Sequence, residues 1–200
     1  MKRSFLYYSK TAPTRGNFGT DIFKAGRLDI AIHTIIATFF LSHTIREDTT
    51  LHLVFDGQPD PTKHLTLKPL DKSDKDDENI YLSKKNVAGL IKRMLYKYKP
   101  DHNNQVFPGY WIEKKPLMKV AEQLESEGQQ LFILDPKGQD IRDIEIPQDS
   151  VFIIGDHNGL PSKELKRLKK IAKPISIGPN TYFASQTVTI VNNELDRREN

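Results

Sequence analysis

The sequence contains no cysteine. Without thiols there are no disulfides, thiolate metal sites, iron–sulfur clusters or cysteine nucleophiles, and a reducing compartment such as the cytoplasm fits this composition. Apolar runs are also short, because the longest, residues 35–41, falls well below the roughly 18 residues of a membrane helix. The first residues carry the basic pair Lys2-Arg3 with no long apolar segment behind it. We therefore expect neither a membrane span nor a signal peptide.

Several familiar catalytic motifs are missing as well. There is no G-x-G-x-x-G after an expected strand, no phosphate-binding P-loop and no G-x-S-x-G nucleophile motif. None of the histidines has the close spacing of a zinc pair; they are His33, His43, His52, His64, His102 and His157. We therefore expect no metal site.

Positive charge is modest in total but concentrated along the chain. Lys and Arg number 30 and Asp and Glu 26, which gives a net charge of +4. Lys84–Lys99 contains cations and no acid, Lys163–Lys173 contains cations and a single acid, and the acids gather around 74–78 and 135–145. Two interpretations stay open: a phosphate-facing surface for nucleic acid, or the solvated outer faces of amphipathic helices.

The 200 residues suit one domain, and no linker divides them, so we expect a single domain over 1–200. Apolar patterns predict strands at 3–8, 50–56, 130–134, 151–155 and 174–177, with a short one at 110–112. Helical spacing predicts helices at 27–44, 86–98, from 116 onward, 162–172 and 183–197, with loops at 10–26, 61–79 and 100–106. Alternating strands and helices favour an α/β fold, a mostly parallel sheet with flanking helices.

Three loops in the last third of the sequence each follow an apolar strand. They are 134–140, 155–161 and 177–182, and each contains glycine or proline. In a parallel sheet the carboxyl ends of the strands share one edge, where open α/β folds bind ligands. The sequence therefore predicts a ligand site at this edge, although such loops also serve as plain turns.

An ordered set of short motifs carries a more specific signal. Gly155-Asp156-His157-Asn158-Gly159-Leu160-Pro161, Ser176-Ile177-Gly178-Pro179, 184–189 (ASQTVT) and 193–197 (NELDR) resemble the carboxyl-terminal half of the SPOUT superfamily of RNA methyltransferases. Within it, the chain resembles the tRNA pseudouridine-54 N1-methyltransferases of archaea and their bacterial relatives. The amino-terminal half agrees through 12–14 (APT), 26–29 (GRLD), 42–48 (SHTIRED), 53–61 (LVFDGQPDP) and 77–79 (DEN).

This resemblance implies a trefoil knot near the carboxyl terminus, a homodimer, and S-adenosylmethionine bound in the knot. By matching motifs, the residues around its adenosine are Leu134, Gly155, Ile177, Gly178, Pro179 and Thr187. Many relatives have cysteine where this chain has Thr187, and histidine where it has Gln186. Thr187 keeps a small side chain and a hydroxyl contact.

The implied reaction moves a methyl group to N1 of pseudouridine in tRNA, and that nitrogen carries a proton. A carboxylate within hydrogen-bond distance accepts such a proton, and a neighbouring cation holds the base or phosphate. Arg27 and Asp29 match the Arg-x-Asp motif of related enzymes, so we expect Asp29 as the proton acceptor and Arg27 as the substrate clamp. Alternatively, Asp29 only favours a helix N-terminus through the helix dipole.

Two other functions stay open at this point. One is the same chemistry on another RNA, such as ribosomal RNA. The other is RNA binding without catalysis on the same fold.

Overall fold

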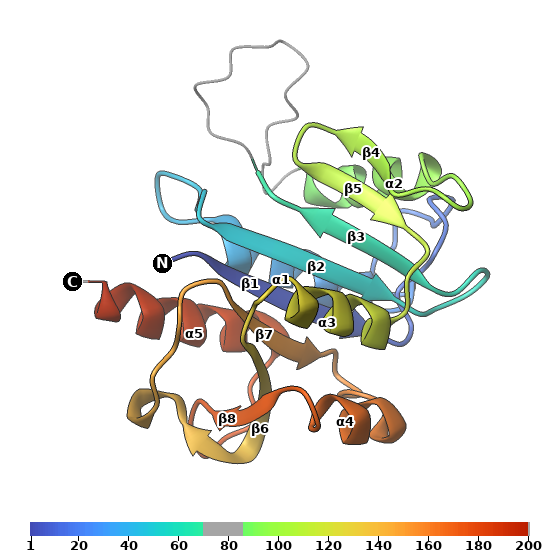
Figure 1. Cartoon of the computed structure of the whole chain (residues 1–200). Helices are drawn as coiled ribbons and strands as arrows, with labels where there is room; N and C mark the ends of the chain where they lie inside the picture. The colour runs from blue at the N-terminus through green and yellow to red at the C-terminus, as the bar shows by residue number, and fades with distance from the viewer. Residues whose placement is uncertain (70–85, 200) are drawn as a thin grey trace.

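The computed structural model describes residues 1–69 and 86–199, and in them an eight-stranded mixed sheet is flanked by five α-helices (Figure 1). In chain order the elements are β1 (Arg3–Ser9), α1 (Leu28–Phe39), β2 (Thr49–Phe55), β3 (Lys63–Leu67), α2 (Val87–Tyr96), β4 (Asn104–Phe107), β5 (Tyr110–Glu113), α3 (Leu117–Ser126), β6 (Leu131–Asp140), a 3-10 turn (Ile141–Asp143), β7 (Ser150–Gly155), α4 (Ser162–Leu168), β8 (Lys173–Ser176) and α5 (Ala184–Arg198). Three sequence features lie outside the described residues: the acids at 74–78, the motif at 77–79, and Lys84 and Lys85.

The sheet runs in the order β4-β5-β3-β2-β1-β7-β6-β8. β1 pairs in parallel with β2 and β7, and β6 pairs in parallel with β7 and β8. The pairs β2–β3, β3–β5 and β4–β5 are antiparallel. The α/β class is thus confirmed, but the parallel arrangement covers only five of the eight strands, β2, β1, β7, β6 and β8. Loops were expected where β3 and β4 lie, and the short connections 56–62 and 108–109 leave no room for the crossover that a parallel pair needs.

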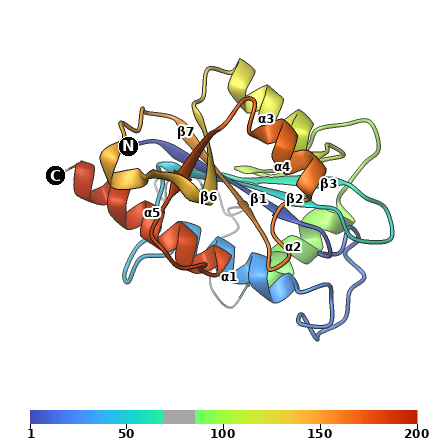
Figure 2. The same ribbon diagram turned by 90° about the horizontal axis from the view of Figure 1, so that it is seen from below.

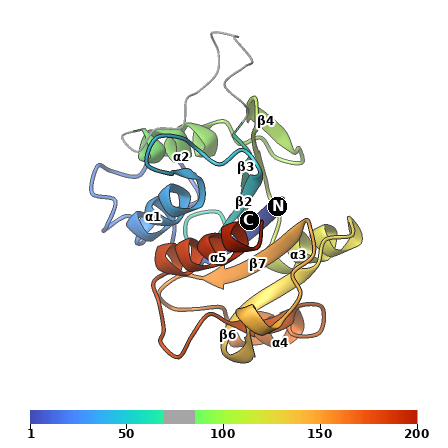
Figure 3. The same cartoon turned by 90° about the vertical axis from the view of Figure 1, so that its left-hand side faces the viewer.

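Helices cover both faces of the sheet, and β1 shows how (Figures 2 and 3). Phe5 and Tyr7 pack in the core cluster formed with α1, α2 and α5, whereas Leu6 and Tyr8 pack with α3 and α4. A central strand covered on both faces carries apolar side chains on both of them, and the unbroken run Phe5–Tyr8 is the pattern from which β1 was predicted.

The helix expected at 27–44 is shorter in the structure. α1 ends at Phe39 because Phe40 adopts an extended conformation, φ −90° and ψ 124°, and forms a β-bridge with Ile45. The chain therefore reverses direction before β2 instead of continuing as helix.

β6 is irregular where it meets β8. Leu134 and Gln139 both pair with Ile175, and the residues between them bulge out of the ladder. Gly138 lies so close that a Cβ there would stand 2.5 Å from the Ile175 backbone. The two ends of the bulged segment, Leu134 and Gln139, therefore both lie next to Ile175 of β8.

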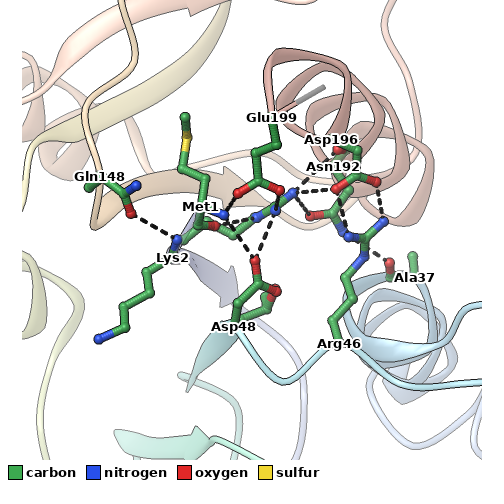
Figure 4. A network of polar contacts seen from close by, with 11 residues as sticks. Met1, Lys2, Ala37, Arg46, Asp48, Gln148, Asn192, Asp196 and Glu199 are labelled. Carbon is green, nitrogen blue, oxygen red and sulfur yellow. Dashed lines mark hydrogen bonds and ion pairs between the residues drawn. The ribbon is translucent and has the colours of Figure 1, made fainter.

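The two ends of the chain meet in a network of ion pairs around Arg3. Figure 4 labels its other members, Met1, Arg46, Asp48, Asp196 and Glu199. The Arg3 side chain is only 1% exposed, and its guanidinium donates to Asp48 at 3.0 Å and to Asp196 at 2.9 Å. Glu199 pairs with Arg3 at 3.4 Å and also with the Met1 amino group. Arg46 donates to Asp196 at 2.7 Å. The network ties the start of β1 and the segment before β2 to the end of α5.

A second buried polar cluster lies between the sheet and α3. His52 Nδ1 is 3.0 Å from His64 Nε2, and His64 Nδ1 is 2.9 Å from Glu113 Oε1. Burial raises the pKa of Glu113, but hydrogen bonds from His64 and Lys115 outweigh it and hold the value at about 2. Since this carboxylate is ionised, His64 donates to it through Nδ1. Burial lowers the pKa of both imidazoles, so both rings are neutral at pH 7, and Nε2 of His64 then accepts from Nδ1 of His52.

Acid is expected to destabilise the protein through this pair. Burial, with the neighbouring His64 charge, lowers the pKa of His52 from 6.5 to about 3, and burial also lowers that of His64. The unfolded chain therefore takes up a proton on the His52 ring near pH 6.5, while the folded chain does not. The contribution of His52 to the free energy of unfolding is complete above pH 6.5 and is lost as the pH falls toward 3. Each ring contributes a slope of up to about 1.4 kcal/mol per pH unit.

Urea unfolding between pH 4 and pH 7.5 measures this effect. His52→Gln should flatten the pH dependence in that window, whereas His33→Gln, at an exposed position of α1, should leave it unchanged. An unchanged slope in the His52 variant would rule out the assignment.

Candidate functional site

The middle of β6 and the carboxyl ends of β7 and β8 surround a cavity of about 400 Å³. The loops predicted at 155–161 and 177–182 meet here, but the loop predicted at 134–140 is wrong, because these residues belong to β6 and pair with β8. The start of α5 adds to the wall, and Ile30 of α1 closes one side. Predicted residues that line the cavity are Leu134, Gly155, Ile177, Gly178 and Thr187. Pro179 stands between the lining residues Gly178 and Asn180 and is not itself part of the wall.

Glycine is required at two positions of this wall. A Cβ on Gly155 would lie 2.5 Å from the carbonyl carbon of Gly159 and 2.8 Å from the Leu160 nitrogen, so the loop after β7 folds directly over it. Gly178 has φ +133°, a conformation that L-residues rarely adopt. These glycines fix the course of the two loops.

A buried carboxylate, Asp156, belongs to the same wall. Its side chain is 1% exposed, and Oδ2 accepts from Ser9 Oγ at 2.9 Å and from the Lys10 amide at 3.1 Å. Oδ1 accepts from the Asn158 amide at 2.8 Å. Asp156 thereby ties the end of β1 to the loop after β7. Our sequence analysis did not assign it a role, although an acid directly after a buried strand, at the ligand-binding edge, is the signal that marks it.

Arg27 and Asp29 form a two-pronged ion pair at the start of α1. Arg27 Nε donates to Asp29 Oδ1 at 3.0 Å and Nη2 donates to Oδ2 at 3.1 Å. Arg27 adopts a left-handed conformation, φ 59° and ψ 38°, which turns the chain into the helix. The hydrogen bond from Arg27 lowers the pKa of Asp29, so the carboxylate is ionised at neutral pH.

This pair lies beside the cavity rather than in its wall. The next residue, Ile30, lines the cavity, and Tyr7 of β1 connects the two regions. Burial, followed by the Asp156 charge, raises the pKa of Tyr7, and the charges of Asp29 and Arg27 also act on its hydroxyl. The Arg27–Asp29 pair and Asp156 are thus close enough to act on one tyrosine.

The basic stretch that starts α4 follows directly from the loop at 155–161. Its cations are exposed, namely Lys163, Lys166, Arg167, Lys169, Lys170 and Lys173. Arg167 pairs with Glu164 and Glu122, and Lys169 pairs with Asp135. In the other stretch, Lys92 is half-buried and donates to the Phe18 carbonyl at 3.2 Å. Lys163–Lys173 therefore presents six exposed cations, whereas the described part of Lys84–Lys99 presents three, Arg93, Lys97 and Lys99.

Among residues 1–69 and 86–199, no group of three or more histidine and acidic side chains is arranged to hold a metal ion. Within the same ranges, no helix has both the length and the apolar character needed to cross a membrane.

Comparison with known proteins identifies the family. Residues 2–200 match the family model described as "Putative SAM-dependent RNA methyltransferase". A tRNA (pseudouridine(54)-N(1))-methyltransferase of Methanococcoides burtonii is 32% identical over 98% of this chain and 96% of its own length. A protein of Vibrio atlanticus named "Putative pseudouridine methyltransferase" is 32% identical over 98% of both chains.

A solved structure supports the same fold. The crystal structure of Archaeoglobus fulgidus Nep1 bound to S-adenosylhomocysteine superposes with a TM-score of 0.64 at 13% identity, over 100% of both chains. The resemblance drawn from the motifs is confirmed, and the chain belongs to the family of S-adenosylmethionine-dependent RNA methyltransferases that includes the tRNA pseudouridine-54 N1-methyltransferases.

Proposed function

We propose that this protein methylates N1 of pseudouridine 54 in tRNA with S-adenosylmethionine as the methyl donor. The observation that carries the proposal is the placement of the ionised Asp29–Arg27 pair beside the cavity that Leu134, Gly155, Ile177, Gly178 and Thr187 line. Full-length relatives with this activity in their names support the choice of substrate.

The cavity fits the cofactor in size and character. Its volume of about 400 Å³ lies within the range of small-molecule sites, roughly 300–1,000 Å³. The Asp156 carboxylate in its wall complements a positively charged ligand. When bound, S-adenosylmethionine supplies an electrophilic methyl group on a sulfonium sulfur.

Individual residues take distinct parts in holding the adenosine. Leu134 and Ile177 line the cavity with apolar side chains that would hold the adenine, and Gly155 and Gly178 would let the backbone approach it. Pro179 restricts the backbone of the loop after β8, and Thr187 offers a hydroxyl from the first turn of α5.

Asp29 receives the proton of the reaction. The Asp29 carboxylate would take the N1 proton of pseudouridine and pass it on to water, and bound S-adenosylmethionine would supply the methyl group. While Arg27 grips both oxygens, Asp29 is a weak base. An Arg27 guanidinium drawn toward an RNA phosphate releases the carboxylate, raises its basicity and clamps the substrate at the same time.

Mass spectrometry of nucleosides tests the proposal. Purified protein is incubated with S-adenosylmethionine and tRNA in which position 54 is pseudouridine, and in parallel with ribosomal RNA. N1-methylpseudouridine at position 54 of tRNA is expected. Product only in ribosomal RNA would transfer the reaction to that substrate, and RNA binding without product in either would leave a non-catalytic binding protein.

The knot and the single-domain organisation over 1–200 are part of this proposal. The pairing of both Leu134 and Gln139 with Ile175 supports the knot, because it brings the two ends of the bulged segment 134–139 to the same residue of β8, next to the cavity. The continuous sheet, with β1 next to β7, supports one domain.

A homodimer in the cytoplasm completes the proposal. Phe183 is 70% exposed, and a shallow groove beside it is lined by Tyr182, Ser185, Gln186, Thr189 and Ile190. Tyr182 and Gln186 line the cofactor cavity as well, so a partner on this face of α5 completes the surroundings of the site. Light scattering at micromolar concentration should give the mass of two chains, and a monomer mass would exclude the dimer.

The cytoplasm is where unmodified tRNA is available.

Gly155→Val is expected to weaken S-adenosylmethionine binding. The added side chain collides with the backbone of Gly159 and displaces the loop after β7. Overpacking of this kind costs about 1–3 kcal/mol, or roughly 5- to 150-fold in affinity. Calorimetry measures the change, and Gly89→Val, where the new side chain meets open space, is the matched control. Native affinity in the Gly155 variant would contradict the assignment of the site.

Binding of RNA is expected to fall steeply with salt. Each phosphate contact contributes a slope of roughly 0.7 to 0.9 in a plot of log affinity against log salt concentration. The double variant Lys166→Gln, Lys170→Gln removes two exposed cations from the stretch Lys163–Lys173. It should lower the slope by the contribution of about two phosphate contacts. Lys2→Gln, at the opposite end of β1, should not change it. Equal slopes in the native protein and in both variants would mean that Lys163–Lys173 is only a solvent-exposed face and does not contact phosphates.

A further inference from the structure

The segment between β1 and α1 presents an exposed aromatic ring next to the Arg27–Asp29 pair. Phe23 is 60% exposed, whereas most large apolar side chains of the described residues are buried. Single exposed apolar side chains are common on protein surfaces, so exposure alone assigns no role. The surroundings of Phe23 give it one.

The backbone around Phe23 is held in place. The Ala25 amide donates to the Asp21 carbonyl at 3.0 Å, and the Arg27 amide donates to the Phe23 carbonyl at 3.2 Å, which forms a single helical turn. Thr11 Oγ1 donates to the Gly26 carbonyl at 2.8 Å, and a Cβ on Gly26 would collide with the Thr11 carbonyl. The ring is therefore carried by a turn that is docked against the chain leaving β1.

One face of the ring is already occupied by a cation. The Arg27 guanidinium lies 4.3 Å from the ring centroid, and the same guanidinium holds both oxygens of Asp29. The other face of an aromatic ring that is 60% exposed remains open to solvent. Arg27 thus joins Phe23, which lies against the face of the guanidinium, to Asp29, which binds its edge, and the uncovered face of the Phe23 ring is a flat apolar surface beside this pair.

We propose that the open face of Phe23 stacks an unpaired nucleobase of the RNA, next to the nucleotide that is methylated. This inference rests on the proposed function. Rings interleaved with cations are the usual platform for single-stranded nucleic acid, because every base has a stackable face. Lys24, 85% exposed, follows Phe23 directly and offers a charge for the adjoining phosphate. A base that must reach Asp29 has to leave its own stack, and its neighbour then needs a new surface.

The contacts of Arg27 also explain how RNA binding can reach the proton acceptor. The same guanidinium lies over the Phe23 ring and donates from Nε and Nη2 to Asp29. A base on Phe23 places its own backbone near Arg27, which is the guanidinium that must leave Asp29 for that carboxylate to gain basicity. Phe23 thereby selects unpaired RNA at the entrance of the site.

Equilibrium binding of a tRNA stem-loop tests the inference without relying on catalysis. The RNA carries pseudouridine at the target position and fluorescent 2-aminopurine at each flanking unpaired position in turn. Phe23→Ala and Phe23→Leu should both weaken binding by about 10- to 100-fold, and Phe23→Trp should restore it. Leucine keeps apolar volume but no flat face, so it separates stacking from simple burial. Tyr96→Ala, at an equally exposed aromatic on α2, is the matched control and should bind normally.

Fluorescence adds a direct readout. One flanking 2-aminopurine should be quenched by the native protein and by Phe23→Trp, but not by Phe23→Ala. S-adenosylmethionine affinity, measured by calorimetry, should be the same in all variants and shows that each one is folded. Unchanged RNA affinity in Phe23→Ala overturns the inference, and so does a change in oligomeric mass, which would mean that the ring packs on a second copy. RNA binding that depends on Phe23 without any methylation would keep the inference and refute the proposed reaction.

Discussion

Asp29→Asn should slow methyl transfer by about 100- to 10,000-fold, the usual effect of losing a general base. The amide keeps the size of the carboxylate but cannot take a proton. Because Asp29 lies outside the cavity wall, the affinity for S-adenosylmethionine should be unchanged. Rates are measured at saturating cofactor with tRNA containing pseudouridine 54, and calorimetry gives the affinity.

Two further variants identify the role of the pair. Arg27→Gln should weaken RNA binding and rate together, because a clamp acts in both the ground and the transition state. Asp149→Asn removes an exposed acid just before β7, at the end of that strand opposite the cavity, and should leave both quantities unchanged. Near-native turnover in Asp29→Asn would reduce Asp29 to an acid that favours the start of α1, and Asp156, the carboxylate in the cavity wall, would be the next candidate.

Arg3→Met should lower the free energy of unfolding by about 3 kcal/mol, the lower end of the range for breaking a buried ion pair from one side. The Arg3 side chain is buried, but its partners Asp48, Asp196 and Glu199 are 35–37% exposed, so water partly replaces the lost cation. The three carboxylates are left close together and repel one another.

Urea unfolding at pH 7 measures this loss. Lys2→Met, at the exposed neighbouring position, is the control and should change stability by less than about 0.5 kcal/mol. Arg3→Lys keeps the charge but loses the fork that reaches several acids, so it should fall between the two. A loss below about 1 kcal/mol in Arg3→Met would mean that the network adds little to the fold.

The sequence predicted the parallel half of the sheet well, because β1, β2, β6 and β7 are short apolar runs bounded by turns. It failed at β3, where Lys63 and His64 interrupt the apolar pattern although both are buried. Their burial depends on partners from elsewhere: Lys63 pairs with Asp60, and His64 with Glu113. Such compensation becomes visible only when the partners are placed together.

Part of the candidate site could likewise be predicted from the sequence, and part could not. Glycine-containing loops after apolar strands pointed to the cavity, and family motifs pointed to Arg27 and Asp29. Periodicity carries no information on the pairing of those two side chains, on the hydrogen bonds that Asp156 accepts, or on the ring of Phe23 under the Arg27 guanidinium. The contact between Arg3 and Asp196 joins residues 193 positions apart, a separation at which no local pattern operates.

The central place of β1 governs how the chain folds while it is being synthesised. β1 is made first, and β2 pairs with one of its edges soon afterwards, but its other edge waits for β7 at 150–155. During that interval the nascent chain exposes an open edge containing Phe5, Leu6 and Tyr7, which invites pairing with other chains. α5, which covers the same strand through Val188 and Val191, leaves the ribosome later still. The emergence of β7 and α5 from the ribosome, rather than collapse of the first half, therefore ends the period in which the exposed edge of β1 can cause aggregation.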